Sequence, residues 1–259
     1  MGGRMEENGQ QVHAAQEDPL QGCTTRALCA SFDTPGDAFE WFGGATYAEV
    51  RDRELQIVQS SHRDGAEEVG LPAYMVFDVE TDGGSPKQLV IQLAFMVFDA
   101  QDREVFRFNE LLKLPPGKKI NYYSIQVHKI TDEVLDLRGV TPRSELATFF
   151  EWVDKVQAQR GLLIAHNAAF DVACVTNTAA ENALPREICS SECFCTMRAA
   201  TARCGLVDKR GRPKPPKNSV LYEILHGAPP DFACLHDALD DVRVTAASYQ
   251  TGRQKGWWP

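Results

Sequence analysis

The sequence predicts an α/β domain built on one mixed β-sheet with helices packed on its faces. Two features of the pattern predict this fold. Three strand-like runs come first with only turns between them, which indicates an antiparallel meander. Short apolar runs then alternate with segments of helical periodicity, which is typical of a chain that adds strands and covering helices to a sheet.

The meander begins with residues 74–80, an apolar run that ends at the turn-forming residues 82–84. Residues 89–99 and 104–114 are the next two predicted strands, and the polar residues 100–103 form the turn between them.

The second half of the domain alternates helices with short strands. Its first helix carries the apolar stripe of Leu146, Phe149, Phe150 and Val153. The predicted elements, in chain order, are a helix over 142–159, a strand over 162–165, a helix over about 169–181, a strand over 194–197, and helices near 219–226 and 237–249.

We expect three segments: an N-terminal extension over 1–70, a domain over 71–252 and a short C-terminal tail over 253–259. The extension is predicted to be partly disordered, because its first residues are polar with few large apolar side chains. Residues 47–59 have the pattern of a short amphipathic helix. The extension either docks on the domain or binds a protein partner, and its sequence favours neither.

The charge of the chain excludes some functions. The net charge is −9, whereas a protein that reads DNA through bulk electrostatics is normally basic. An enzyme that grips a strand end at a metal site is compatible with this charge, because the bound cations supply the positive charge.

No apolar run approaches the ~18 residues of a membrane span, and the first residues lack the apolar segment of a secretory signal. We therefore expect an intracellular protein in a reducing compartment, with its 8 cysteines as free thiols. Four of them lie between Cys189 and Cys204, but their spacing fits no two-pair zinc pattern, so we predict no zinc.

Asp78 and Glu80 are the first candidate site residues. Two residues apart on a strand, they point to the same face, at the carboxyl end where open α/β sheets place their sites. Two carboxylates are costly to bury on an apolar strand unless a cation pairs with them. The alternative is a strand end that opens into solvent, and the pair alone does not separate the two.

Residues 166–171 follow directly on the predicted strand 162–165. Asn167 is a candidate cap for the next helix, and Asp171 falls in its first turn, where the helix dipole favours a carboxylate. This role explains an isolated Asp171, but not a third acidic residue just past a second parallel strand.

Residues 236–241 are the most informative stretch. On one continuous helix, His236 and Asp241 would lie about 140° apart. If Asp237 caps the helix and Asp240 is its third residue, His236 falls on the entering loop and can fold back over Asp241. Capping then explains Asp237 and Asp240, but neither His236 nor Asp241.

Together these segments offer four carboxylates and one histidine: Asp78, Glu80, Asp171, Asp241 and His236. Ligation by oxygen alone suits Mg²⁺ or Mn²⁺. Two such ions activate a water and stabilise the leaving oxygen of an in-line displacement, and histidine suits the role of base for that water. The combination indicates phosphodiester hydrolysis.

The motif order resembles that of the DEDDh (DnaQ-like) 3′→5′ exonucleases of the ribonuclease H-like superfamily. The motifs are D-x-E within 77–81, H-N-x-x-F-D over 166–171 and H-D-A-x-x-D over 236–241. Two weaker stretches, 127–131 and 195–198, resemble the family as well, and the resemblance covers about residues 73–250.

This resemblance implies a five-stranded mixed sheet with helices on both faces, and release of nucleoside 5′-monophosphates from single-stranded DNA or RNA by two metal ions. It implies that Asp78, Glu80 and Asp241 ligate the first ion directly and Asp171 through water. Asp78 would bridge to the second ion, and His236 would be the general base. The implied pocket for the 3′-terminal nucleotide comprises Thr81, Asp82, Gly83, His128, Asn167 and Phe170.

Two residues depart from the family pattern. Asp82 stands where members often have threonine and adds a negative charge near the terminal nucleotide, and Lys129 replaces the glycine beside His128. Because neither is a metal ligand, they bear on substrate preference rather than on catalysis.

A basic loop precedes the last motif. Its cations are Lys209, Arg210, Arg212, Lys214 and Lys217. One interpretation is a solubilising surface loop, and the other is an arm that tracks the phosphates of the incoming strand.

The main rival interpretation is a catalytically silent protein of the same fold that binds nucleic acid or serves as a scaffold. Loss of a ligand would favour it, and all five positions are intact here. The sequence separates neither DNA from RNA nor one oligomeric state from another, because recognition of the 2′-hydroxyl depends on the shape of the pocket.

Overall fold

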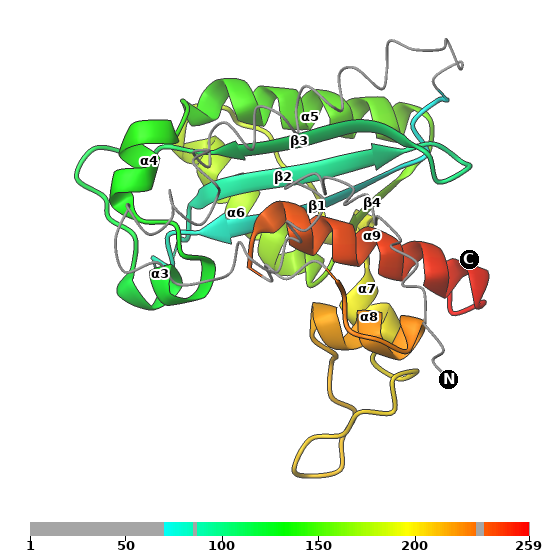
Figure 1. Ribbon diagram of the computed structural model, residues 1–259. Coiled ribbons are helices and arrows are strands. Elements are labelled where there is room, and N and C mark those ends of the chain that lie inside the picture. Colours follow the sequence, from blue (N-terminus) through cyan, green and yellow to red (C-terminus); the bar gives the residue numbers. More distant parts are fainter. Residues whose placement is uncertain (1–69, 85–86, 232–235, 259) are drawn as a thin grey trace, which may run out of the picture.

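Five strands form one mixed sheet in the order β3-β2-β1-β4-β5 (Figure 1). The computed structural model describes residues 70–84, 87–231 and 236–258. The strands are β1 (Tyr74–Thr81), β2 (Val90–Phe98), β3 (Glu104–Leu111), β4 (Leu162–Ala165) and β5 (Cys193–Cys195). The first three pair antiparallel, and β4 and β5 join parallel to β1, which confirms the predicted mixed sheet.

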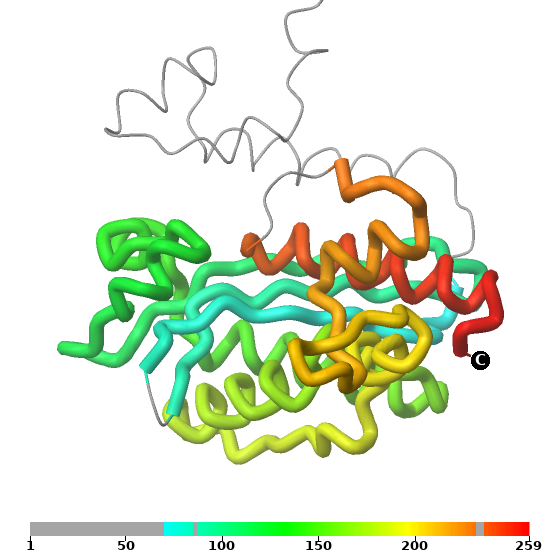
Figure 2. Tube along the Cα trace, turned by 90° about the horizontal axis from the view of Figure 1, so that it is seen from below, coloured from blue at the N-terminus to red at the C-terminus, as the bar shows by residue number. Residues whose placement is uncertain are grey.

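Helices cover both faces of this sheet, as predicted. Figure 2 shows the three layers from below, with α9 on one side of the strands and α6 on the other. The helices are α3 (Tyr122–His128), α4 (Asp132–Arg138), α5 (Pro142–Ala158), α6 (Ala168–Glu181), α7 (Thr196–Ala200), α8 (Asn218–His226) and α9 (Ala238–Gln254), with a 3₁₀ turn η2 (Ser190–Glu192). No helix within the described ranges has both the length and the apolar character needed to cross a bilayer.

The alternation of β1 side chains decides where its two acids point. Phe77 and its neighbours at odd positions pack into the core under α5 and α6. Tyr74 and Val76 pack into the opposite core, under α8 and α9. Because successive side chains alternate between faces, Asp78 and Glu80 continue the second series and face α9.

The short helices α3 and α4 lie where no element was predicted from the sequence. Each has only seven residues, too short for a clear apolar period. Each begins at a side-chain cap: Asn121 accepts a hydrogen bond from Tyr123 N, and Thr131 accepts one from Val134 N. The caps define these helices more clearly than their hydrophobicity does.

Two predicted boundaries differ from the structure. The predicted strand over 194–197 ends at Cys195, and the next two residues begin α7 instead. The helix predicted to end near 249 continues to Gln254, so the predicted domain boundary at 252 falls inside α9. Trp258 then packs into the core under α9, where its indole N–H donates to the carbonyl of Tyr249 at 2.8 Å.

Several expectations lie outside the described residues. They concern the N-terminal extension over 1–69, including the short helix expected over 47–59 and the docking of a partner. The described cysteines, Cys174, Cys189, Cys193, Cys195 and Cys204, are free thiols.

Candidate active site

The site lies at the carboxyl end of β1, where the sheet opens. β1 and β4 pair only from Tyr74 to Val76, so the rest of β1 has an edge that β4 does not cover. Asp78 and Glu80 lie on this last part of the strand, and both are partly exposed. The alternative of a frayed strand end does not hold, because β1 stays paired to β2 through Thr81.

The first turn of α6 fills the open edge of β1. Asp171 is 2% exposed and accepts a hydrogen bond from the backbone of Val79. Asn167 occupies the N-cap position in the left-handed region, with φ of 76°, but its side chain makes no capping hydrogen bond. Asn167 is thus the N-cap residue, as predicted, but its exposed side chain does not satisfy a backbone N–H of the helix.

The start of α9 supplies the last two predicted residues. Asp237 is the N-cap, and its side chain accepts hydrogen bonds from Leu239 N and Asp240 N, as predicted. His236 then adopts a left-handed backbone, with φ of 79°, and its backbone N–H donates to Asp241 Oδ2 at 2.9 Å. The chain has folded back over Asp241, as the capping argument required.

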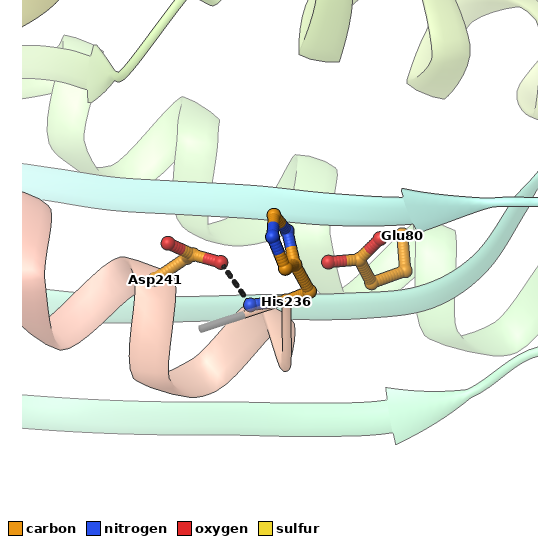
Figure 3. A group of neighbouring side chains, drawn as sticks. All are labelled: Glu80, His236 and Asp241. Atoms are coloured by element: carbon orange, nitrogen blue, oxygen red, sulfur yellow. Dashed lines mark hydrogen bonds between the residues drawn. The ribbon is translucent and has the colours of Figure 1, made fainter. Parts of the chain in front are cut away.

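Glu80, His236 and Asp241 form a group in the described part of the chain that could hold a metal ion, and Asp78 and Asp171 lie outside this group. One ligand atom from each lies within 4.8 Å of those of the others. Figure 3 shows the imidazole of His236 between the two carboxylates. Glu80 on β1 thus meets two residues at the entrance of α9 that lie 156 and 161 positions later in the chain.

Gln92 of β2 fastens the start of α9 to the sheet, a role that the sequence did not reveal. Its amide donates to Asp237 Oδ2 at 2.9 Å, and its carbonyl oxygen accepts from Ala238 N at 3.2 Å. A glutamine on a buried apolar strand was the available signal, because a buried amide needs partners.

Asn218, the first residue of α8, holds Asp241 from the other side. Its amide nitrogen donates to Asp241 Oδ1 and to the Asp241 carbonyl, both at 3.1 Å. The hydroxyl of Thr245 donates to Asn218 Oδ1 at 3.1 Å and so fixes which way the amide points. This pair was also missed, because nothing in the spacing joins residues from two helices.

His166, the first residue of the second motif, points away from the carboxylates. Its ring lies 3.0 Å from Thr196 Oγ1 and 3.1 Å from the carbonyl of Pro216. Burial lowers the pKa of His166 to about 4, which keeps the ring neutral. Through these contacts it joins the end of β4 to α7 and to the segment before α8.

Burial and neighbouring acidic residues raise the pKa of all four carboxylates. Burial raises the pKa of Glu80 to about 9, and the charges of Asp241, Asp237 and Asp171 add to the effect. Burial also raises the pKa of Asp78, with Asp171 as the largest charged contributor, and it raises the pKa of Asp171 and of Asp241. Such a cluster is costly without a cation.

The residues present fit a bound divalent cation. The ion pairs within the described ranges leave all four carboxylates out. Asp171 Oδ2 is buried and has no hydrogen-bond partner among the described residues. Buried carboxylate oxygens that lack protein partners are the donor set that Mg²⁺ and Mn²⁺ bind.

A pocket of about 320 Å³ adjoins the carboxylates. Of the predicted substrate residues, Thr81, Gly83, His128 and Phe170 line it, together with Glu80. Asn167 is not among the lining residues. The structure adds lining residues that the sequence did not single out: Gln88, Tyr123, Ser124 and Val127. A wider hollow of about 680 Å³ on the outer side of α6 contains none of the predicted site residues.

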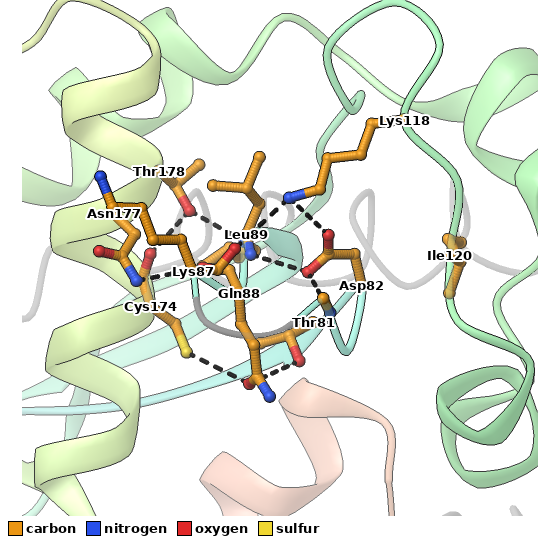
Figure 4. A network of polar contacts seen from close by, with 12 residues as sticks. Thr81, Asp82, Lys87, Gln88, Leu89, Lys118, Ile120, Cys174, Asn177 and Thr178 are labelled. Carbon is orange, nitrogen blue, oxygen red and sulfur yellow. Dashed lines mark hydrogen bonds and ion pairs between the residues drawn. The ribbon is translucent and has the colours of Figure 1, made fainter.

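The prediction that Asp82 places a negative charge near the substrate is wrong. Its side chain is 0% exposed and turns into the loop that follows β1. It accepts hydrogen bonds from Gly84 N at 3.1 Å and Leu89 N at 2.8 Å, and pairs with Lys118 at 2.8 Å (Figure 4). Asp82 therefore shapes the pocket loop, and its charge is matched by a lysine.

Gly83 and His128 form a fixed part of the pocket wall. Gly83 has φ of 68°, and a Cβ there would lie 2.0 Å from Ser124 Oγ, so only glycine lets the loop approach α3 this closely. Burial lowers the pKa of His128 to about 4, and its Nδ1 accepts a hydrogen bond from Ile130 N at 3.0 Å. Its neutral ring thus serves as a fixed wall.

The basic loop joins α7 to α8 and projects away from the sheet (Figure 1). Lys209, Arg210, Arg212, Lys214 and Lys217 are all exposed. Arg212 pairs with Asp208 at 2.7 Å. The end of the loop leads into Asn218, so its base lies against Asp241.

The part of the chain that carries this site matches a known protein family. The RNase_T family, described as exonuclease, matches residues 75–249, which include every carboxylate of the cluster. No curated protein matches the chain.

Solved structures share the fold at low sequence identity. E. coli Exonuclease I in complex with a dA16 oligonucleotide superposes with a TM-score of 0.54 and 15% identity over 70% of this chain and 40% of that chain. The cell-death related nuclease CRN-4 superposes with a TM-score of 0.56 and 15% identity over 71% of this chain and 64% of that chain. A 3′-exonuclease whose structure concerns 3′-end specific recognition of a histone mRNA stem-loop superposes with a TM-score of 0.53. The identity is 12% over 71% of this chain and 82% of that chain. The chain thus spans less than half of Exonuclease I.

Proposed function

Because the chain belongs to the RNase_T exonuclease family, among the DEDDh exonucleases of the ribonuclease H-like superfamily, we propose that it hydrolyses single-stranded DNA or RNA from the 3′ end. Water attacks the phosphorus of the last phosphodiester, and the bond to the 3′ oxygen of the preceding nucleotide breaks. The products are a nucleoside 5′-monophosphate and a strand one nucleotide shorter with a free 3′-hydroxyl.

The grouping of Glu80, His236 and Asp241 next to a pocket carries this proposal, and Asp78 and Asp171 lie close enough for their charges to affect the same cluster. Asp78 and Glu80 come from β1, Asp171 from α6, and His236 and Asp241 from the start of α9. Burial and neighbouring acidic residues raise the pKa of all four acids, a pattern that favours a catalytic site over a scaffold.

Exonucleases of this family generally use divalent metal ions, and we propose Mg²⁺ or Mn²⁺, two ions per site. Asp78, Glu80, Asp171 and Asp241 would hold them. When bound, such ions lower the pKa of water and neutralise charge on the reacting phosphate. The protein contributes the fixed position of these ligands, which Gln92 and Asn218 secure on the side of α9.

His236 is proposed as the general base that takes the proton from the attacking water. Its backbone N–H, and not its ring, makes the hydrogen bond to Asp241, so the imidazole stays available for proton transfer. The ring is exposed to solvent beside Glu80, where an attacking water has access.

The pocket is proposed to hold the 3′-terminal nucleotide. Gly83 and His128 form one wall, and Phe170, which is 40% exposed, offers an apolar face for a base. The expected contact through Asn167 stays a proposal, since its exposed side chain at the head of α6 lies outside the lining of the pocket.

The basic loop is proposed to track the phosphates of the incoming strand. Its exposed cations include Lys209, Arg210, Lys214 and Lys217, in a chain of net charge −9, and its base contacts the site through Asn218. A role of this kind depends on salt, because each neutralised phosphate releases counterions.

Digestion of 5′-labelled single-stranded DNA and RNA of equal sequence tests the proposal. Each strand is incubated with Mg²⁺, Mn²⁺ or EDTA, and with the variants Asp241→Asn and Asp240→Asn. Asp240 is the matched control, because it neighbours Asp241 on α9 but pairs with Arg243 at 2.7 Å.

We expect a metal-dependent ladder that shortens from the 3′ end, is lost in Asp241→Asn and persists in Asp240→Asn. The faster substrate identifies the preferred nucleic acid. Retained strand binding without cleavage in any metal would refute the proposal and leave the silent, strand-binding interpretation in its place.

A further inference from the structure

One surface beside the pocket is not explained by the carboxylate chemistry. Residues 118–129 contain three lysines and two tyrosines and no acidic residue, in a chain of net charge −9. They form α3 and the turn that leads into it. We call Lys119, Tyr122, Tyr123, Val127 and Lys129 the α3 surface.

The aromatic side chains of this surface are held out into solvent. Tyr122 is 67% exposed and Tyr123 is 79% exposed, and Val127 beside them is 47% exposed. The two rings pack edge to face with centroids 5.7 Å apart. Adjacent large aromatic side chains gain little from staying in water, so a patch of this kind indicates a binding surface.

The α3 surface is fixed relative to the carboxylates. Asn121 caps α3, and its backbone N–H donates to the carbonyl of Asp82 at 2.8 Å, in the loop directly after β1. Lys118 pairs with the buried Asp82 and ties the entering turn to the same loop. Figure 1 shows α3 at the end of the sheet toward which β1 points.

The surface is also continuous with the pocket. Tyr123 and Val127 line the pocket together with Glu80, and Phe170 faces them from α6. Tyr122 extends the aromatic surface beyond the pocket lining. Lys129 is the exposed residue that ends α3, and Lys119, in the turn before α3, is exposed and pairs with Asp132 at 3.6 Å.

We propose that the α3 surface binds the unpaired bases of the strand, with Tyr123 stacking on the 3′-terminal base and Tyr122 on the base behind it. Stacking on aromatic rings beside cations is the usual way in which proteins hold single strands without reading sequence. A base inside a duplex has no free face for these rings, so the substrate must be unpaired over its last two nucleotides. The proposal rests on the proposed function, because it takes the pocket to hold a 3′ end.

Binding to intact and abasic strands tests this inference. A labelled 12-nucleotide strand is titrated with protein in Ca²⁺ buffer by fluorescence anisotropy, and its integrity is checked afterwards. The matched strands lack only the base of the terminal or of the penultimate nucleotide. The proteins are the unmodified chain, Tyr123→Ala, Tyr123→Phe, Tyr122→Ala and Leu137→Ala, a control for truncating an 84% exposed apolar side chain on α4.

We expect Tyr123→Ala to weaken binding of the intact strand about tenfold, while Tyr123→Phe, which keeps the stacking ring, stays close to the unmodified protein. On the strand without its terminal base, Tyr123→Ala and the unmodified protein should bind equally. Tyr122→Ala should show the same pattern for the penultimate base, and Leu137→Ala should change nothing.

Equal losses on intact and abasic strands would overturn the inference, because the tyrosines would then act without a base. An absence of any loss would also overturn it, as expected for a surface that docks a protein. The test does not depend on cleavage: if the protein shortens no strand in Mg²⁺, the proposed function fails, while the binding pattern still decides the role of α3.

Discussion

Asp82 lies next to Asp78 and Glu80 in the chain, but the surroundings of its carboxylate differ from theirs. Asp82, directly after β1, has a lysine and two backbone N–H groups for its carboxylate. Asp78 and Glu80, on the end of the same strand, have no ion-pair partner among the described residues, and burial raises their pKa values. A carboxylate with hydrogen-bond and ion-pair partners stabilises the fold. A cluster of carboxylates without such partners lowers stability, and a bound cation would explain why the protein keeps it.

Removing one proposed metal ligand should have the largest effect on activity. It should lower activity while raising the stability of the metal-free protein. Asp171→Asn keeps an acceptor for the backbone of Val79 but removes a buried carboxyl that must either hold a proton or carry a charge near Asp241. We expect exonuclease activity to fall on the order of 10³-fold, because metal ligation supplies several kcal/mol of transition-state stabilisation. We expect the metal-free protein to melt at a higher temperature. Activity assays and thermal unfolding in EDTA measure the two effects, and a lower melting temperature would contradict the account.

Asp82→Ala should have the opposite effects: it should lower the stability of the protein and leave metal binding unchanged. It strands the buried Leu89 N–H and leaves Lys118 without its partner, at a cost of about 2–3 kcal/mol of unfolding free energy. Urea unfolding measures the loss, and the metal affinity of the folded variant should stay near that of the unmodified protein. A variant that unfolds normally but loses its metal would mean that Asp82 belongs to the cluster after all.

Asn218→Ala should have a smaller effect, of about tenfold, on metal affinity and on kcat. The amide orients Asp241 without touching the substrate, so the Mn²⁺ affinity measured without substrate should fall as well. Asn182→Ala is a matched control, because that amide only caps the end of α6 through the Thr178 carbonyl. Equal losses of affinity in both variants would assign the effect to general destabilisation.

The pH dependence of the metal-free protein should be the smallest effect. Glu80 keeps its proton in the folded state up to a pKa of about 9 but loses it at ordinary acidic pH when unfolded, so the folded state binds more protons in between. Stability should therefore rise by about 1 kcal/mol for each pH unit as the pH falls from 9 to 7. Below about 6.5, His128 and His166 oppose this trend, because their folded pKa values are lowered to about 4. Urea unfolding in EDTA at pH 9, 8 and 7 checks the slope, and a flat or opposite slope would contradict it.

Sequence alone predicted the parts of the fold that depend on periodicity. The apolar strand 74–80, the helix over 142–159 and the order of the meander follow from patterns of two and of 3.6 residues, and the structure confirms them. The fold-back of His236 over Asp241 was also predictable, because the capping role of Asp237 dictates where the helix begins.

The missed features depend on contacts between distant segments. Gln92 and Asn218 hold the start of α9 from β2 and from α8, and no local pattern joins these residues. Asp82 was misplaced for the same reason, since its partner Lys118 lies 36 positions away and came to it only through the fold. Short helices such as α3 carry too little periodicity to be seen without their caps.

Calorimetric titration of Mn²⁺ into the metal-free protein tests the central claim most directly. We compare the unmodified chain with Asp78→Asn and with Asp240→Asn, whose carboxylate is paired with Arg243. The account predicts saturable binding to the unmodified chain, loss of binding in Asp78→Asn and unchanged binding in Asp240→Asn. If the unmodified chain shows no saturable binding, or if Asp78→Asn binds as well as it does, the unsatisfied carboxylates do not form a metal site and the account is wrong.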